Sequence, residues 1–170
     1  MPRYVLRPDA DVKADWTEDA VGTAWSKLDE AIEYPTAPTT GSDRITTSSS
    51  VATSSQGVTT TTLGVGEEII SATAWVYGKA VDASNYYQIT IYDGAGTAQL
   101  VGTNYTSGSF GWGSVTYVGL LSQAKLDALE IRIISVGTGA LEVCAAYLEV
   151  TTTLQSIALS GRRPQIRTRA

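Results

Sequence analysis

The alternation of apolar and polar side chains over residues 129–152 constrains the fold of this chain more than any other feature. Apolar residues recur at every second position in two runs, which is the period of a β-strand that buries one face. The apolar positions are Leu129, Ile131 and Ile133 in the first run and Leu141, Val143 and Ala145 in the second. Because Gly137-Thr138-Gly139 separates the runs, and glycine enters turn conformations at little steric cost, we expect a β-hairpin. A lone hairpin is only marginally stable in water, so a second layer must cover its apolar face.

Other segments repeat the strand pattern at close intervals. Residues 70–77 and 86–92 alternate clearly, and the second of these is followed by a Gly-rich turn and a further strand, which predicts another hairpin. Shorter strands are expected at residues 4–6 and 114–120. The Thr- and Ser-rich stretch 43–63 has two interpretations, a flexible linker or a pair of outer strands on either side of Ser54-Ser55-Gln56-Gly57, with Ile45, Val51, Val58 and Leu63 as core contacts. We favour strands, because Thr has good β-propensity.

Two segments have helical spacing instead. Trp25, Leu28 and Ile32 fall three and four residues apart, which predicts one or two turns of helix before Pro35. Ser122 can cap a second turn over residues 121–129, a position from which the chain can cross from one sheet to another. In the last strand, Glu142 and Glu149 have opposite parity. Either a β-bulge near Ala145-Ala146 changes the register, or a Tyr147 face is exposed and bound to a partner.

These patterns predict an all-β protein, a two-sheet antiparallel β-sandwich of the jelly-roll-like kind with one or two short helical turns. Hydrophobic residues make up 43% of the 170 residues, enough to build the core of one domain. We place that β-sandwich domain at residues 1–153 and a C-terminal basic arm at residues 154–170, where the alternation ends.

The composition argues against several kinds of active site. The chain has no histidine and one cysteine, which removes a Ser-His-Asp triad, a Cys-His pair, an imidazole zinc site and an intrachain disulfide. Cys144 lies in an alternating strand, where we expect a packed small apolar side chain. The acidic residues Asp9, Asp11, Asp15, Glu18 and Asp19 do not have the spacing of a calcium loop, so we expect a solvated loop. We therefore expect no catalytic residues, no cofactor and no metal, and the adjacent pair Glu67-Glu68 would point to opposite faces of a strand.

One aromatic segment is a candidate for partner binding. Phe110 and Trp112 lie among glycines after Tyr105. Such aromatic side chains can plug the open end of the sandwich, anchor a protein contact or stack on sugar rings. We favour the plug and keep protein contact and sugar binding as alternatives.

The charge distribution makes the arm a second candidate. The net charge is −5, but the four arginines after residue 161 leave residues 1–161 with a charge of −9. The arm is either disordered or docks on a neighbouring subunit, with apolar residues against that subunit and arginines near acidic groups. The candidate contacts are Leu154, Ile157, Leu159, Arg162, Arg163, Arg167 and Arg169. Four charges without a basic folded surface favour a protein partner over nucleic acid. No apolar run is long enough to span a membrane, and the first residues lack a signal-peptide apolar region, so we expect synthesis in the cytoplasm.

Several segments together resemble the single-domain β-sandwich structural proteins of tailed bacteriophages. They are the opening YVLRPDADVKADW, then WSKLDEAIEYP and DRITTSS, the central WVYGKA and YYQITIYDG, and the closing LSQAKLDALEIRIISV and LEVCAAYLEV. The likeness is a pattern of strands and turns over most of residues 3–152, and the arm lies outside it.

The resemblance implies a non-enzymatic virion protein that is made in the host cytoplasm and assembles into the virion. We expect a capsid decoration or cement protein that binds the major capsid protein or another virion protein and associates with itself, with a trimer favoured. The alternatives are a neck or tail accessory protein, and a carbohydrate-binding module or tail adhesin that would use the aromatic segment.

Overall fold

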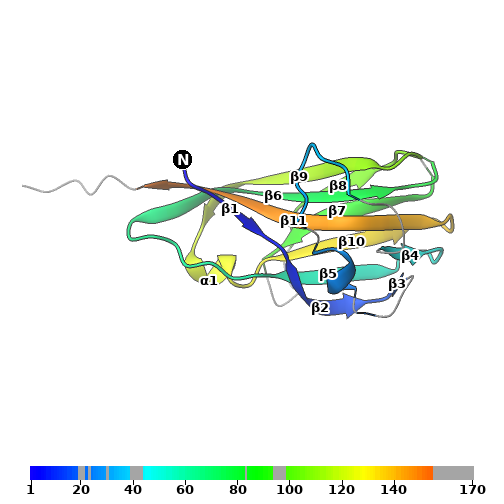
Figure 1. The fold of residues 1–170 in the computed structure, drawn as a ribbon, viewed down its shortest axis with the longest axis horizontal. Helices are drawn as coiled ribbons and strands as arrows, with labels where there is room; N and C mark the ends of the chain where they lie inside the picture. Colours follow the sequence, from blue (N-terminus) through cyan, green and yellow to red (C-terminus); the bar gives the residue numbers. More distant parts are fainter. Residues whose placement is uncertain are drawn as a thin grey trace, which may run out of the picture.

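A computed structural model describes residues 1–18, 22, 24–29, 31–38, 44–82, 84–93 and 99–154, without the side chain of Trp25. Two antiparallel sheets pack face to face, with their strands along the long axis of the molecule (Figure 1). The predicted all-β sandwich is therefore confirmed. The arm after Leu154 lies outside the described residues, and so do its candidate contacts from Ile157 to Arg169.

The described strands divide between a sheet of six and a sheet of five. Sheet A contains β1 (Arg3–Leu6), β3 (Thr17–Glu18), β4 (Ile45–Thr47), β6 (Glu67–Lys79), β9 (Gly111–Leu121) and β11 (Leu141–Leu154). Sheet B contains β2 (Pro8–Ala14), β5 (Thr53–Val58), β7 (Tyr86–Tyr92), β8 (Gln99–Tyr105) and β10 (Glu130–Val136). A short 3₁₀ helix, η1 (Trp25–Lys27), and a single turn of α-helix, α1 (Gln123–Leu126), complete the described elements.

Strands β4 to β11 follow the jelly-roll order. In sheet A the order is β4-β11-β6-β9, and in sheet B it is β5-β10-β7-β8. Successive strands alternate between the sheets, apart from β7 and β8, which form the predicted second hairpin. The N-terminal strands extend this framework, because β1 pairs with β11 and β2 pairs with β5.

The hairpin predicted over residues 129–152 is wrong. Strand β10 lies in sheet B between β5 and β7, whereas β11 lies in sheet A between β6 and the pair β1 and β4. Residues 137–140 cross from one sheet to the other. Gly137 has a positive φ of 85°, and the N–H groups of Thr138 and Gly139 each donate to Oδ1 of Asn85 at 2.9 Å. The apolar faces of the two strands thus meet across the core instead of side by side.

Four smaller predictions also need correction. Residues 8–14 form strand β2 instead of a solvated loop, and Ser54 to Gly57 lie within β5 instead of forming a turn. Val51 is 71% exposed, although Ile45 and Val58 do reach the core. The predicted helix before Pro35 is present only as the 3₁₀ turn η1.

Other predictions are confirmed. The side chain of Ser122 caps α1, which carries the chain from sheet A to sheet B. The register of β11 on β6 shifts between Val143 and Ala145, so the expected bulge includes Cys144, which is fully buried. Alternate residues of β6, β7, β10 and β11 fill the space between the sheets. The largest fully buried side chains include Tyr87, Ile89, Ile91, Ile131, Ile133 and Leu141.

Candidate functional site

A cluster of aromatic side chains covers the outer face of sheet A. Strands β6, β9 and β11 supply most of it, because their residues that do not enter the core point to this face. Trp75 lies against Tyr147 with ring centroids 6.2 Å apart, and Trp112 meets both rings edge-on at 6.5 and 5.6 Å. Tyr77 stacks on Phe110 at 6.0 Å and meets Trp112 at 5.2 Å. Edge-on and offset contacts of this kind stabilise a cluster beyond the burial of its area.

A strap formed by residues 31–38 lies over this aromatic cluster. The N–H of Tyr34 donates to the hydroxyl of Tyr147 at 3.1 Å, and the ring of Tyr34 stacks on Trp75 with centroids 4.7 Å apart. Further along, Nε1 of Trp112 donates to the carbonyl oxygen of Thr36 at 2.9 Å. The Tyr34 side chain itself stays 55% exposed. The strap therefore supplies hydrogen-bond partners to Tyr147 and Trp112 and leaves the Tyr34 ring accessible.

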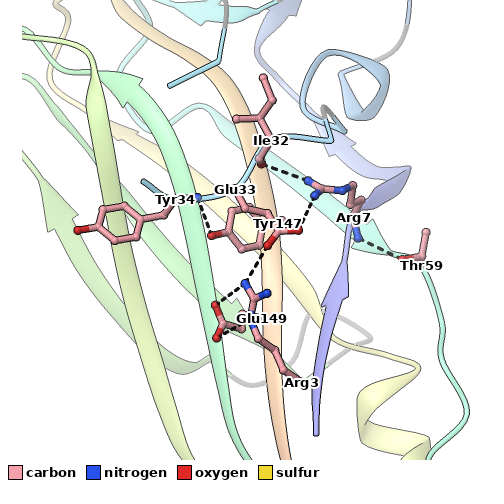
Figure 2. Close-up of polar contacts among 8 residues, drawn as sticks. All are labelled: Arg3, Arg7, Ile32, Glu33, Tyr34, Thr59, Tyr147 and Glu149. Atoms are coloured by element: carbon pink, nitrogen blue, oxygen red, sulfur yellow. Dashed lines mark hydrogen bonds and ion pairs between the residues drawn. The ribbon is translucent and has the colours of Figure 1, made fainter. Parts of the chain in front are cut away.

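Ion pairs fix the strap to the first strand, as Figure 2 shows. Glu33 accepts from Arg3 at 2.9 Å and from Arg7 at 3.1 Å. Arg3 also pairs with Glu149 of β11 at 3.0 Å, and the guanidinium of Arg7 lies 5.6 Å from the centroid of the Tyr147 ring. Donating hydrogen bonds to the carboxylates of Glu149 and Glu33 raises the pKa of Arg3 above its ordinary value. These ion pairs join β1, the strap and β11.

The structure brings Phe110 and Trp112 together and places Tyr105 elsewhere. Trp112 lies in β9 instead of in a loop, and both rings belong to the outer aromatic cluster, with Nζ of Lys79 5.1 Å from the Phe110 centroid. Tyr105 ends β8 and stacks on Tyr87 at 4.9 Å, at the edge of the main core. Since all three rings pack on other rings of the chain, this arrangement favours packing over an open platform for sugar stacking.

A second candidate is a groove at the end of the sandwich where β11 finishes. It has a volume of about 510 Å³ and is lined by Leu63, Leu120 and Leu121 together with the carboxylates of Glu67 and Glu68. The N-terminus and α1 lie at this same end (Figure 1). Exposed apolar side chains gather here: Val65 is 97% exposed, Leu120 69% and Leu154 66%. We call this region the apolar end.

Glu67 organises the polar part of the apolar end. Its Oε2 accepts from the hydroxyl of Tyr4 at 2.6 Å and from the N–H of Gly64 at 2.8 Å, and its Oε1 accepts from Thr152 at 3.1 Å. These hydrogen bonds, led by that from Tyr4, lower the pKa of Glu67 below its ordinary value. The carboxylate thus joins β1, β6 and the end of β11.

Replacing Glu67 with glutamine is expected to reduce the loss of stability in acid. A carboxylate whose pKa is lowered by folding stabilises the native state above its unfolded pKa, and this stabilisation disappears as the pH falls through the lower folded value. Thermal unfolding from neutral to strongly acidic pH should show the wild type more stable at neutral pH, with the two curves converging in acid. Glu68→Gln, which removes the neighbouring charge but none of these hydrogen bonds, is the matched control. Curves that stay parallel into acid would contradict this role.

The opposite end of the sandwich carries a polar groove of about 480 Å³. Glu142 lies there between Arg44 and Lys79, with both ion pairs at 2.7 Å. Asp15 also lines the groove and pairs with Lys13 at 2.8 Å, which lowers the pKa of its carboxyl group. The two ends of the molecule therefore differ in chemistry, one apolar with carboxylates and one rich in ion pairs.

The described residues contain neither a cluster of metal-binding side chains nor a membrane-spanning helix. They contain no group of three or more histidine, cysteine or acidic side chains placed to hold a metal ion. Asp9 and Asp11, considered above for calcium, lie on β2, where Asp11 accepts from the N–H of Ala24 at 3.1 Å. Within the same residues, no helix has the length and apolar character needed to cross a membrane.

Comparison with known proteins adds no family. No protein-family model matches the chain. No curated protein matches it either.

The aromatic cluster and its strap were missed by sequence reasoning as a unit. The alternation over residues 70–77 puts Trp75 and Tyr77 on the face opposite to Ala74 and Val76, but no local pattern indicates that their rings meet Phe110 and Trp112. The only local signal is their shared parity on strands, which becomes informative once β6 and β9 are known to be neighbours.

Proposed function

We propose that this chain is a structural protein that works by adhesion and, in line with the resemblance above, a capsid decoration or cement protein of a tailed bacteriophage. The apolar end and the C-terminal arm bind the shell and neighbouring copies. Many weak contacts repeated by symmetry add up to stable attachment. A neck or tail accessory protein would use the same kind of contacts. Binding to purified capsid shells therefore distinguishes a capsid protein from a neck or tail protein.

The observation that carries this proposal is the concentration of exposed apolar groups at the end from which the arm departs. Leu154, the last residue of β11, pairs with Glu67 beside the groove. The arm that follows holds Ile157 and Leu159 and then four arginines without an acid. Apolar and cationic groups on the arm match the leucines and carboxylates of such an end on a neighbouring copy.

The fold and the rest of the surface support an adhesive role. The strap covers the part of the outer face of sheet A that carries the aromatic cluster, and the rings and ion pairs there contact one another. A rigid sandwich of this kind presents its ends as fixed contact points, which keeps the entropic cost of binding low.

The full chain and a version ending at Thr153 test the proposal when they are measured by light scattering, alone and mixed with purified capsid shells. The full chain is expected to coat shells, and the shortened chain is expected to lose this binding. If both forms ignore shells, the capsid proposal fails.

Two further variants separate the contributions of the arm. Replacing Ile157 and Leu159 with serine keeps the charge, whereas replacing the four arginines with glutamine keeps the apolar residues. The arginine variant is expected to show binding that no longer weakens with added salt, because charge pairs at exposed sites are screened. Val65→Asp tests the apolar end itself, and we expect weaker binding to shells with no change in folding, since Val65 is almost fully exposed.

A further inference from the structure

Strand β9 forms an open edge of sheet A. It pairs with β6 along one side, and in the part of the chain that the structure describes no strand pairs with its other side. The strand runs for 11 residues, from Gly111 to Leu121. Its unpaired N–H and C=O groups form a template on which another strand can add.

The residues of β9 do not protect this edge. Edge strands of soluble proteins usually carry charges, proline or bulges that prevent pairing with another molecule. β9 has neither a charged residue nor a proline, and it lies within residues 94–124, the longest run of the sequence without a charge. Its register on β6 shifts once, between the pairs Val118–Ser71 and Leu121–Ile69. Two exposed apolar side chains stand on its outer face, Val118 at 78% and Leu120 at 69%.

The opposite flank of the sandwich is protected in each of these ways. Strand β2, the edge of sheet B, contains Pro8, Asp9, Asp11 and Lys13, and its register on β5 shifts twice. On the same flank of sheet A, β3 has two residues and β1 has four. The edge strands on the β2 flank are therefore short or carry charges and a proline, whereas β9 on the other flank is long and uncharged and can pair with another strand.

We propose that β9 pairs with β9 of a second copy, antiparallel and about a twofold axis at Gly119. Directly opposite residues in an antiparallel pair point to the same face. Val118 of one copy then lies opposite Leu120 of the other, and the same contact is repeated by the twofold, so a single pairing covers both exposed apolar side chains. The two sheets A become one continuous sheet.

The charge distribution favours a second copy as the occupant. Residues 1–161 carry a net charge of −9, so most orientations of two copies bring like charges together. Strand β9 carries no charge along its length, and the carboxylates of Glu67 and Glu68 lie at its C-terminal end, beside Leu120 and Leu121. Pairing along β9 therefore brings fewer carboxylates face to face than most other orientations. A twofold interface is also self-complementary by construction, so the same uncharged strand serves on both sides.

This inference goes beyond the proposed function, because the pairing needs neither the arm nor a shell. It also gives a dimer where the phage resemblance favours a trimer. Both proposals use the exposed Leu120, but the pairing is tested at Val118 and the adhesive role at the arm, so the two proposals can fail separately.

Light scattering of the full chain, from dilute to concentrated solution, tests the pairing. We expect a mass that approaches twice the 18.0 kDa of the chain. Val118→Lys is expected to return the mass to that of one chain, because two lysines would stand beside the twofold axis in an apolar contact. Val12→Lys on β2, where the valine is 53% exposed, is the matched control and is expected to leave the dimer intact. Val118 is so exposed that its replacement is expected to leave thermal unfolding of the single chain unchanged.

Hydrogen exchange locates the contact independently. Amides of residues 116–121 are expected to exchange more slowly as the wild type is concentrated, and this dependence is expected to vanish in Val118→Lys. A single-chain mass at every concentration, a trimer, or a dimer that survives Val118→Lys would each overturn the proposal. A dimer that is lost on removing the arm but kept in Val118→Lys would assign the contact to the arm, which overturns this pairing and leaves the adhesive proposal standing.

Discussion

Replacing Arg132 with alanine is expected to destabilise the protein by about 3–5 kcal/mol, because it leaves a buried carboxylate without its charge partner. Arg132 lies on β10, where its Nε and Nη2 donate to Oε2 of Glu130 at 3.0 and 2.9 Å. Glu130 is only 6% exposed, and its Oε2 also accepts a hydrogen bond from the hydroxyl of Ser55 at 2.7 Å. The guanidinium also lies 3.8 Å from the centroid of the Tyr92 ring, so the same substitution removes a cation–π contact.

Urea unfolding of two further variants checks this interpretation. Glu130→Gln combined with Arg132→Ala is expected to recover much of the loss, because the double variant no longer buries an unpaired charge. Lys13→Ala breaks the exposed pair with Asp15, whose side chains are 55% and 39% exposed, and is expected to cost less than about 1 kcal/mol. If Arg132→Ala were no more destabilising than Lys13→Ala, the buried pair would have no special weight.

Glu130 shows which structural features an alternating sequence pattern does not predict. The alternation around Ile131 and Ile133 correctly predicts which side chains enter the core. It also predicts that Glu130 and Arg132 face away from the core, but it does not say what covers them. Glu130 is buried because Ser55 of β5 and Arg132 enclose it, and the partner of β10 cannot be identified from β10 alone.

The incorrect prediction of a hairpin over residues 129–152 has the same cause, because the pairing partner of a strand cannot be identified from that strand alone. A period of two residues defines which face of a strand is apolar, but a strand that turns back beside its neighbour and a strand that crosses to the opposite sheet have the same period. Gly137 and Gly139 indicate a turn in both cases. What decides the outcome is the competition among long-range pairings, in which β6 takes one side of β11 and β5 and β7 take both sides of β10.

The candidate surfaces were only partly predictable for a related reason. Phe110 and Trp112 were recognisable as large rings among glycines, and the arm was recognisable by its charge. By contrast, the ion pairs of Glu33 with Arg3 and Arg7 join residues 30 and 26 positions apart, and no local pattern specifies such contacts. The free edge of β9 is a property of sheet order, so the charge-free run becomes meaningful only once its neighbour β6 is known.

Gly78→Ala is expected to cost about 3 kcal/mol, because the added methyl group has no room on the crowded side of β6. Gly78 pairs with Val143, beside the bulge at Cys144. A Cβ at this position would overlap the backbone carbonyl oxygen of Glu142 and lie 2.9 Å from the Tyr87 hydroxyl and 3.0 Å from a methyl group of Val143. A backbone carbonyl cannot rotate away as a side chain can, so β6 and β11 would have to separate locally and give up part of their pairing.

Gly57→Ala in β5 is the matched control for this substitution. There the nearest atoms to a new Cβ, the Ala10 Cβ and a carboxylate oxygen of Asp9, lie 3.7 Å away, which is ordinary contact distance. We expect Gly57→Ala to stay within about 1 kcal/mol of the wild type, with a small gain because alanine restricts the unfolded chain. Urea unfolding of both variants measures the difference. Equal stabilities would mean that β6 and β11 accommodate a methyl group at the bulge, whereas a large loss confined to Gly78→Ala would show that the bulge depends on the close approach of two backbones, and hence that the register placing Tyr147 beneath the strap depends on it as well.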